Sequence, residues 1–254
     1  MQEKYEVIKL RLSEKSYMPT FHDEYYEYLA KKFRTTVKEL KSGFSKQKDY
    51  YKSLTIPMGK SRIGGSVVDL PPNIEYPHDT CLVAQLNCEE ISKYDKLKLL
   101  PTKGFIYVFI KNMDIEGVSG IVIYSDADVS QLERVIKNES FWFGTGQLIE
   151  GCENLTESFE QRFINEDGEF ELGCNTVEDM TRVYGMYTYG VYEGLWLDSE
   201  PEVREIVENK NNMILLLEIA NDCPEVDGSY SVYINENDLL NRDFSKCIFV
   251  HSQS

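Results

Sequence analysis

The sequence contains no long apolar run and no leader-like N-terminus. Its densest apolar runs, such as Ile214-Leu215-Leu216-Leu217, are far shorter than the roughly 20 residues that a membrane-spanning helix needs. The first residues, Met1-Gln2-Glu3-Lys4-Tyr5-Glu6, lack the basic-then-apolar order of a signal peptide. We therefore expect a cytoplasmic protein with no membrane association.

Basic side chains are also in short supply. Lys and Arg together number 27 against 43 Asp and Glu, which gives a net charge of -16. Such a chain is repelled by phosphate backbones and by anionic membrane surfaces, so we predict no nucleic-acid partner and no membrane partner. A basic protein or peptide would instead be steered towards it. The alternative is that the acidity serves solubility alone.

The sequence lacks the spacings that hold metals. None of the three histidines has an i,i+4 histidine partner. Asp126-Ala127-Asp128 resembles the start of a calcium loop, but Gln131 stands where that loop requires glycine. The six cysteines form no Cys-x-x-Cys pair, which is typical of reduced thiols in a chain large enough to build its own core. We predict no metal and no cofactor.

Catalytic signatures are missing as well. No Gly-x-Ser-x-Gly step occurs, and Gly59-Lys60-Ser61 lacks the upstream glycine of a phosphate loop, because Leu54 stands there. A site assembled in space from distant residues would leave no such signature. The catalytic residues of any activity are therefore unknown, and the sequence favours a protein that is not an enzyme.

The pattern predicts an α+β fold in two parts. Residues 1–55 read as an N-terminal helical extension packed on the core, since Thr20-x-x-Asp23 and Thr36-x-x-Glu39 are capping signals. This segment is locally basic and fits either a partner-binding arm or a solvated helix pair. Residues 56–254 read as one domain with a mixed, mainly antiparallel sheet and interposed helices starting near Ser130, Thr176 and Ser199. Its predicted strands are 81–86, 106–110, 121–124, 214–219, 230–234 and 247–251.

Two segments of the sequence resemble each other. Leu82-Val83-Ala84-Gln85-Leu86 leads through a loop into an aromatic strand at 105–110, and Leu215-Leu216-Leu217-Glu218-Ile219 leads into another at 229–234. Two such hairpins arise either by chance or by duplication. The pattern predicts that the two hairpins occupy similar positions in the sheet. Whether they descend from one ancestral hairpin is a separate question.

The best site candidate is an aromatic, glycine-rich segment between residues 184 and 196. Such rings give a large contact area at low entropic cost, so the segment could line a groove; the alternative is a glycine-kinked strand that closes over the core. The candidate binding residues are Tyr184, Tyr187, Tyr189, Tyr192 and Trp196.

A second candidate lies at the Gly64-Gly65 pair, which predicts a tight turn because glycine adopts positive φ freely. Nearby Lys60 and Arg62 would supply cationic contacts to a carboxylate or phosphate if a ligand approaches this turn. The alternative is a purely structural turn.

A series of short motifs lies between residues 55 and 252. They are Lys60-Ser61-Arg62-Ile63-Gly64-Gly65, Leu70-Pro71, Glu75-Tyr76-Pro77 and Leu82-Val83-Ala84-Gln85-Leu86-Asn87 near the start, with 215–219, 232–234 and 243–245 near the end. Together they resemble the YwqG-like bacterial family, which is named for a protein of unknown function. The sequence departs from that pattern at Val67-Val68, where a proline is usual, and at Gly185-Met186-Tyr187. The resemblance implies a soluble bacterial α+β protein and supplies no catalytic residues.

These observations lead to three functional hypotheses. The first is a non-catalytic binding protein for a protein, peptide or small ligand, for example one that neutralises a basic toxin or effector as immunity proteins do. The alternative is a hydrolase or transferase with a pocket between the Gly64-Gly65 turn and the Tyr184–Trp196 segment. The third is a scaffold protein that forms a symmetric oligomer. The oligomeric state is not indicated by the sequence.

Overall fold

The computed structural model describes most of the chain. The described residues are 4–17, 27, 30–31, 33–47, 56–65, 67–114, 117–136, 143, 145–164, 170–175, 180–185, 206, 212–220 and 229–252. Within them one large antiparallel sheet dominates, in the order β13-β12-β11-β10-β1-β8-β2-β4-β5-β6, with β9 paired to β8 outside this path. The strands are β1 (Lys4–Tyr17), β2 (Arg62–Gly64), β4 (Thr80–Asn87), β5 (Phe105–Asp114), β6 (Gly117–Ser125), β8 (Gly146–Ile164), β9 (Phe170–Asn175), β10 (Arg182–Tyr184), β11 (Met213–Ile219), β12 (Ser229–Asn235) and β13 (Ile248–Ser252).

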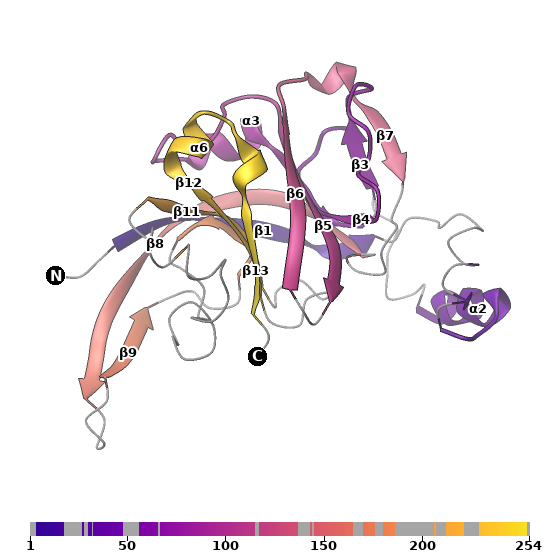
Figure 1. Ribbon diagram of the computed structural model, residues 1–254, viewed down its shortest axis with the longest axis horizontal. Coiled ribbons are helices and arrows are strands. Elements are labelled where there is room, and N and C mark those ends of the chain that lie inside the picture. The colour runs from indigo at the N-terminus through magenta and orange to yellow at the C-terminus, as the bar shows by residue number, and fades with distance from the viewer. Residues whose placement is uncertain are drawn as a thin grey trace.

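The large sheet curls into a nearly closed barrel (Figure 1). Its two end strands, β6 and β13, contact each other without forming a backbone ladder among the described residues. At this seam Gly120 of β6 lies against Phe249 of β13: a Cβ on Gly120 would come within 2.4 Å of the phenylalanine ring. Side-chain packing therefore completes the closure.

The β4-β5 hairpin is buried on both faces. Ile106, Val108 and Ile110 of β5 belong to the main core inside the barrel. The alternate residues, Phe105, Tyr107 and Phe109, form a second core on the outer face. A small two-stranded sheet made of β3 (Val67–Leu70) and β7 (Glu133–Ile136) contributes to this outer core through Val68, Leu70 and Val135. Strands buried on both faces have continuous apolar runs, which is why β4 and β5 are easily seen in the sequence.

The strand order reads the same from both ends of the sheet. The series β1, β2, β4, β5, β6 is matched by β8, β10, β11, β12, β13. Register agrees as well: Arg62 pairs with Gln85 and Arg182 with Glu218 at matching positions. A register shift lies between Leu82 and Ala84 and another between Leu215 and Leu217. The predicted similarity of sheet positions is confirmed, and common descent stays a prediction.

The first strand of each half pairs along the main path only with strands of the other half. β1 lies between β10 and β8, and β8 lies between β1 and β2. The first strands are thus exchanged, and the two halves share one continuous sheet.

The prediction of an α+β fold with an N-terminal helical segment is wrong. Residues 4–17 form β1, near the middle of the sheet, and the protein is mainly β. Alternation of Ile8, Leu10 and Leu12 in the sequence is a strand signal, but the capping signals further on, at Thr20 and Thr36, drew the helical prediction over the whole segment. The helices of the described residues are short: α2 (Val37–Gln47), α3 (Cys88–Ile91), α6 (Glu236–Leu240) and the 3-10 turns η1 (Ser92–Tyr94), η2 (Val129–Gln131) and η3 (Phe244–Lys246).

The capping signals in the sequence predicted some helix starts correctly and others wrongly. The capping box at Thr36 is confirmed, since the Glu39 backbone N–H donates to Thr36 Oγ1 and the Thr36 N–H donates to Glu39 Oε2. The helix predicted from Ser130 is wrong, because this residue lies in the 3-10 turn η2, which ends at Gln131, and β7 follows. The helix predicted from Thr176 is wrong where Val183 lies in β10. Apart from Ile206, the helix predicted from Ser199 lies outside the described residues, as does most of the one predicted from Thr20.

The six predicted strands are all present, as β4, β5, β6, β11, β12 and β13. The division at residue 56 stays a prediction.

Candidate functional site

Arg62, a candidate ligand-binding residue, is completely buried. Its guanidinium lies 2.6 Å from the Asp69 carboxylate, donates to Gln85 Oε1 at 2.8 Å and donates to the Val67 carbonyl at 2.9 Å. The turn between β2 and β3 brings Asp69 back over Arg62, and β4 supplies Gln85. These contacts fix Arg62 as the centre of a buried polar cluster between the two sheets.

Asp69 gathers several donors from different segments. It accepts the Gly59 backbone N–H at 2.7 Å and the Arg134 Nε–H at 2.9 Å, while Tyr107 donates to its backbone carbonyl. Burial alone would raise the pKa of the Asp69 carboxyl, but the Arg134 hydrogen bond and the Arg62 charge hold that pKa below its ordinary value. Asp69 is therefore a carboxylate that joins the small sheet to the barrel.

The Gly64-Gly65 turn is closed by an aromatic ring. Both glycines have positive φ, 59° and 84°. A Cβ on Gly65 would lie 2.2 Å from Cε2 of Tyr17, and the Tyr17 hydroxyl donates to the Gly64 carbonyl at 3.1 Å. Tyr17 thus occupies the space beside this turn.

The Lys60 side chain lies away from the buried cluster around Arg62. Its ammonium pairs with Glu90 at 2.8 Å and remains partly exposed. The pair borders a small hollow of about 180 Å³ that Tyr94, Ile149 and Cys152 also line. Lys60 and Arg62 are therefore near in sequence but lie in separate environments.

Tyr184 lies inside the barrel core, at a positive φ of 63°, two residues after Arg182. Burial raises the pKa of the Tyr184 hydroxyl, and nearby Asp95 raises it further. The other residues of the aromatic candidate, Tyr187, Tyr189, Tyr192 and Trp196, lie outside the described residues. The proposed pocket between this segment and the Gly64-Gly65 turn accordingly stays a prediction.

Arg182 occupies the position in the second half that Arg62 occupies in the first. It contacts Glu157 through an ion pair and Glu218 through a second one of 2.6 Å. Burial by itself lowers the pKa of Arg182, but the two carboxylates more than offset this and raise it. This cluster has an excess of negative charge, whereas the cluster around Arg62 has two arginines for one aspartate.

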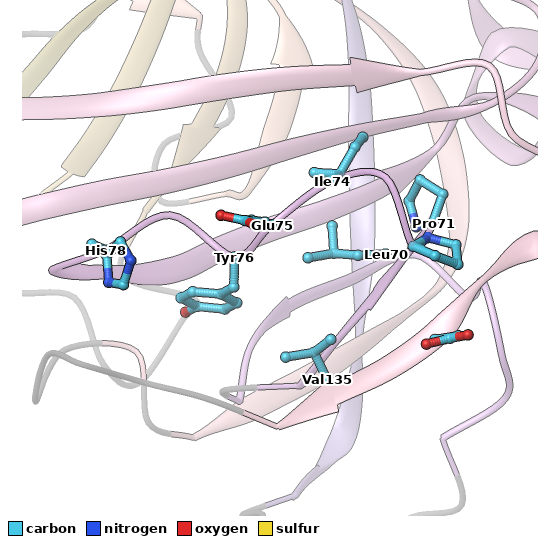
Figure 2. A pocket seen from close by; sticks show the side chains of 9 residues that line it. Leu70, Pro71, Ile74, Glu75, Tyr76, His78 and Val135 are labelled. Carbon is cyan, nitrogen blue, oxygen red and sulfur yellow. The ribbon is translucent and has the colours of Figure 1, made fainter.

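A groove of about 350 Å³ lies beside the small sheet (Figure 2). His78 and Pro71 lie towards its two ends, and Ile74, Leu70, Tyr76 and Val135 lie between them. The lining residues come from the end of β3, from the loop that follows it and from β7: Leu70, Pro71, Pro72, Ile74, Glu75, Tyr76, His78, Glu133 and Val135.

The groove combines a fixed apolar floor with exposed carboxylates. Tyr76 is buried, and its ring meets that of Phe109 edge to face with centroids 5.1 Å apart, which anchors the loop on β5. Glu75 and Glu133 are exposed, and within the described part of the chain neither forms an ion pair. Such a groove can hold the aliphatic stem of a long cationic side chain and accept hydrogen bonds from its head.

The sequence pointed to this region only in part. Leu70-Pro71 and Glu75-Tyr76-Pro77 were noted as motifs, and prolines do fix the loop between β3 and β4. Glu133 was missed because it was placed in a helix. Its membership in β7, opposite Leu70, is a long-range pairing with no local signal.

The described residues contain no group of three or more His, Cys, Asp or Glu placed to hold a metal ion. No helix among them is both long and apolar enough to cross a membrane.

Comparison with protein families identifies an uncharacterised domain family. The family model described as "Domain of unknown function (DUF1963)" matches residues 61–252. A search of curated proteins found no match. The resemblance noted in the sequence is thus confirmed as far as an uncharacterised domain family, and the YwqG-like name stays a prediction.

Proposed function

Since the chain belongs to the DUF1963 family, whose description gives no function, we propose from the groove's geometry that the protein binds a basic protein or peptide. The groove of Figure 2 receives a lysine or arginine side chain of that partner. One observation carries this proposal: two exposed carboxylates, Glu75 and Glu133, border an apolar floor.

The charge of the whole protein supports the same partner. At a net charge of -16 the protein attracts basic molecules over a longer range than any single contact. That attraction raises the association rate, but it does not select a site on the surface. The groove supplies the selection, because a cation with an aliphatic stem satisfies both its floor and its rim.

The other hollow fits this role less well. Around Lys60 the charges already pair, since its ammonium lies 2.8 Å from Glu90. A cationic ligand would have to displace Lys60 before it could reach that carboxylate. The groove beside β7 requires no such exchange.

Fluorescence anisotropy with a short labelled peptide in which lysine alternates with threonine tests the proposal. The double variant Glu75→Gln/Glu133→Gln should weaken binding about tenfold or more, since two charge-assisted contacts are lost. A matched control, Glu14→Gln/Glu153→Gln, removes the same charge at exposed positions in β1 and β8. It should change affinity less than about twofold at physiological salt, because distant charges are screened there.

Equal losses in the two double variants would show that attraction is unspecific and would refute the groove as the site. A peptide with norleucine in place of lysine should not bind. If it binds as tightly as the lysine peptide, the proposed charge recognition is wrong. Neutralisation of a basic toxin or effector is one form that this binding would take in a cell.

A further inference from the structure

β7 forms the outer edge of the small sheet (Figure 1). Within the described residues it pairs with β3 alone. Three of its four residues, Glu133, Arg134 and Ile136, are exposed, and Ile136 keeps 41% of its surface accessible. Every second residue of such an edge directs its backbone N–H and C=O away from the paired strand, where they can bind another chain.

Charged side chains often protect an edge of this kind from pairing with another strand. In β7 the Arg134 side chain does not do so, because its hydrogen bonds hold it elsewhere. Arg134 donates through Nε to Asp69 at 2.9 Å and through a terminal nitrogen to the Ile56 carbonyl at 2.9 Å. Its side chain is thereby tied to the barrel side of the small sheet. Glu133 is left as the charge beside the free edge, and its sign attracts a basic strand.

The edge and the groove belong to the same strand. Glu133 and Val135, two residues apart, both line the groove, as alternation along a strand requires. A strand added to β7 would place every second side chain on this same face, with Cβ atoms roughly 4.5–5.5 Å from those of Glu133 or Val135. Those side chains would reach the groove directly.

We propose that the basic partner binds in an extended conformation as a third strand on the β7 edge, with alternate lysine or arginine side chains in the groove. This inference rests on the proposed function and specifies its geometry. Backbone hydrogen bonds to β7 supply affinity, while Glu75 and Glu133 select basic side chains. A second copy of this chain is a poor occupant because each copy carries a net charge of -16.

Backbone N-methylation of the labelled lysine–threonine peptide tests the inference. In one derivative the lysine nitrogens are methylated, and in the other the threonine nitrogens are methylated. Only one of these two sets faces β7 in an added strand, because successive backbone N–H groups point to opposite edges. One derivative should therefore lose about tenfold or more in affinity while the other binds like the parent peptide. Hydrogen exchange should also slow at amides of residues 133–136 when the parent peptide is bound.

The outcomes separate the two proposals. If both methylated peptides bind like the parent but the Glu75→Gln/Glu133→Gln variant still loses affinity, the added strand is refuted and the groove proposal stands. Sedimentation that shows dimers of the free protein, abolished by the substitution Ile136→Lys, would overturn the inference by assigning the edge to self-association. A parent peptide that does not bind at all refutes both proposals.

Discussion

Replacement of Asp69 by asparagine should destabilise the protein strongly, because it removes the counter-charge of a fully buried arginine. The Arg62 side chain has no accessible surface and lies 2.6 Å from the Asp69 carboxylate. Breaking a buried ion pair by removing one partner typically costs about 3–5 kcal/mol. We expect Asp69→Asn to lower the free energy of unfolding by about that amount, measured by urea denaturation at neutral pH.

Removing the arginine instead of the aspartate should lower the free energy of unfolding by a smaller amount. In Arg62→Met the aspartate keeps its contact with Arg134, whose side chain is partly exposed, so no isolated buried charge remains. The double variant Arg62→Met/Asp69→Leu should recover part of the stability lost in Asp69→Asn, because both buried charges are gone. A loss below about 1 kcal/mol in Asp69→Asn, or a double variant no more stable than Asp69→Asn, would refute the charge reasoning.

Acid unfolding provides an independent check of the same carboxylate. The pKa of Asp69 is lower in the folded protein than its ordinary value of 3.8. Its contribution to stability is therefore complete above that value and is lost as the pH falls through the lowered pKa. Between about pH 5 and 3 the unmodified protein should lose more stability than Asp69→Asn, which has no carboxyl to protonate. Parallel stability curves for the two proteins over this range would contradict the assigned pKa shift.

Three further predictions concern packing and the thiols. Gly120→Ala should lower stability by about 1–3 kcal/mol in urea titrations, since its Cβ would lie 2.4 Å from the Phe109 carbonyl oxygen and from the Phe249 ring, whereas the exposed control Ser119→Ala should have little effect. Gly65→Ala should cost about 2–4 kcal/mol, combining positive φ with overlap of the Tyr17 ring, and an unchanged unfolding midpoint would contradict the closed turn. Burial raises the pKa of the Cys88 thiol to about 12, so iodoacetamide at about pH 8 should label Cys88 only after unfolding, as read by peptide mass spectrometry; fast labelling of the native protein would refute its burial.

The sequence allowed the hairpin strands to be predicted, because their signals are local. Residues 82–86 and 215–219 are apolar runs bounded by turns. All residues of β4 and all but one residue of β11 are buried. The matching polar positions Gln85 and Glu218 were visible as well. Each of them lies opposite a buried arginine of a neighbouring strand. This shared position could be recognised only once the strand register was known.

Other elements could not be found from local pattern alone. β8 (Gly146–Ile164) carries many polar residues, and its place in the sheet depends on pairing with the distant β1. The candidate site shows the same division. The prolines and Glu75 of the groove lie in a recognisable motif, whereas Glu133 joins them only through the pairing of β7 with β3. Arg62 looked available for a ligand until Asp69 and Gln85, from two other strands, were seen to surround it.

The exchange of first strands has a consequence for how the protein is made. β1 leaves the ribosome before the other described strands, yet both of its partners, β8 and β10, belong to the second half of the sequence. The buried residues Val7, Ile8 and Leu10 of β1 therefore lack their native partner strands until most of the polypeptide has been synthesised. The first half therefore cannot complete its sheet before β8 and β10 have been synthesised, and until then apolar side chains of β1 lack their native contacts. The residues of β1 are thus synthesised before the rest of the sheet and buried after much of it has formed.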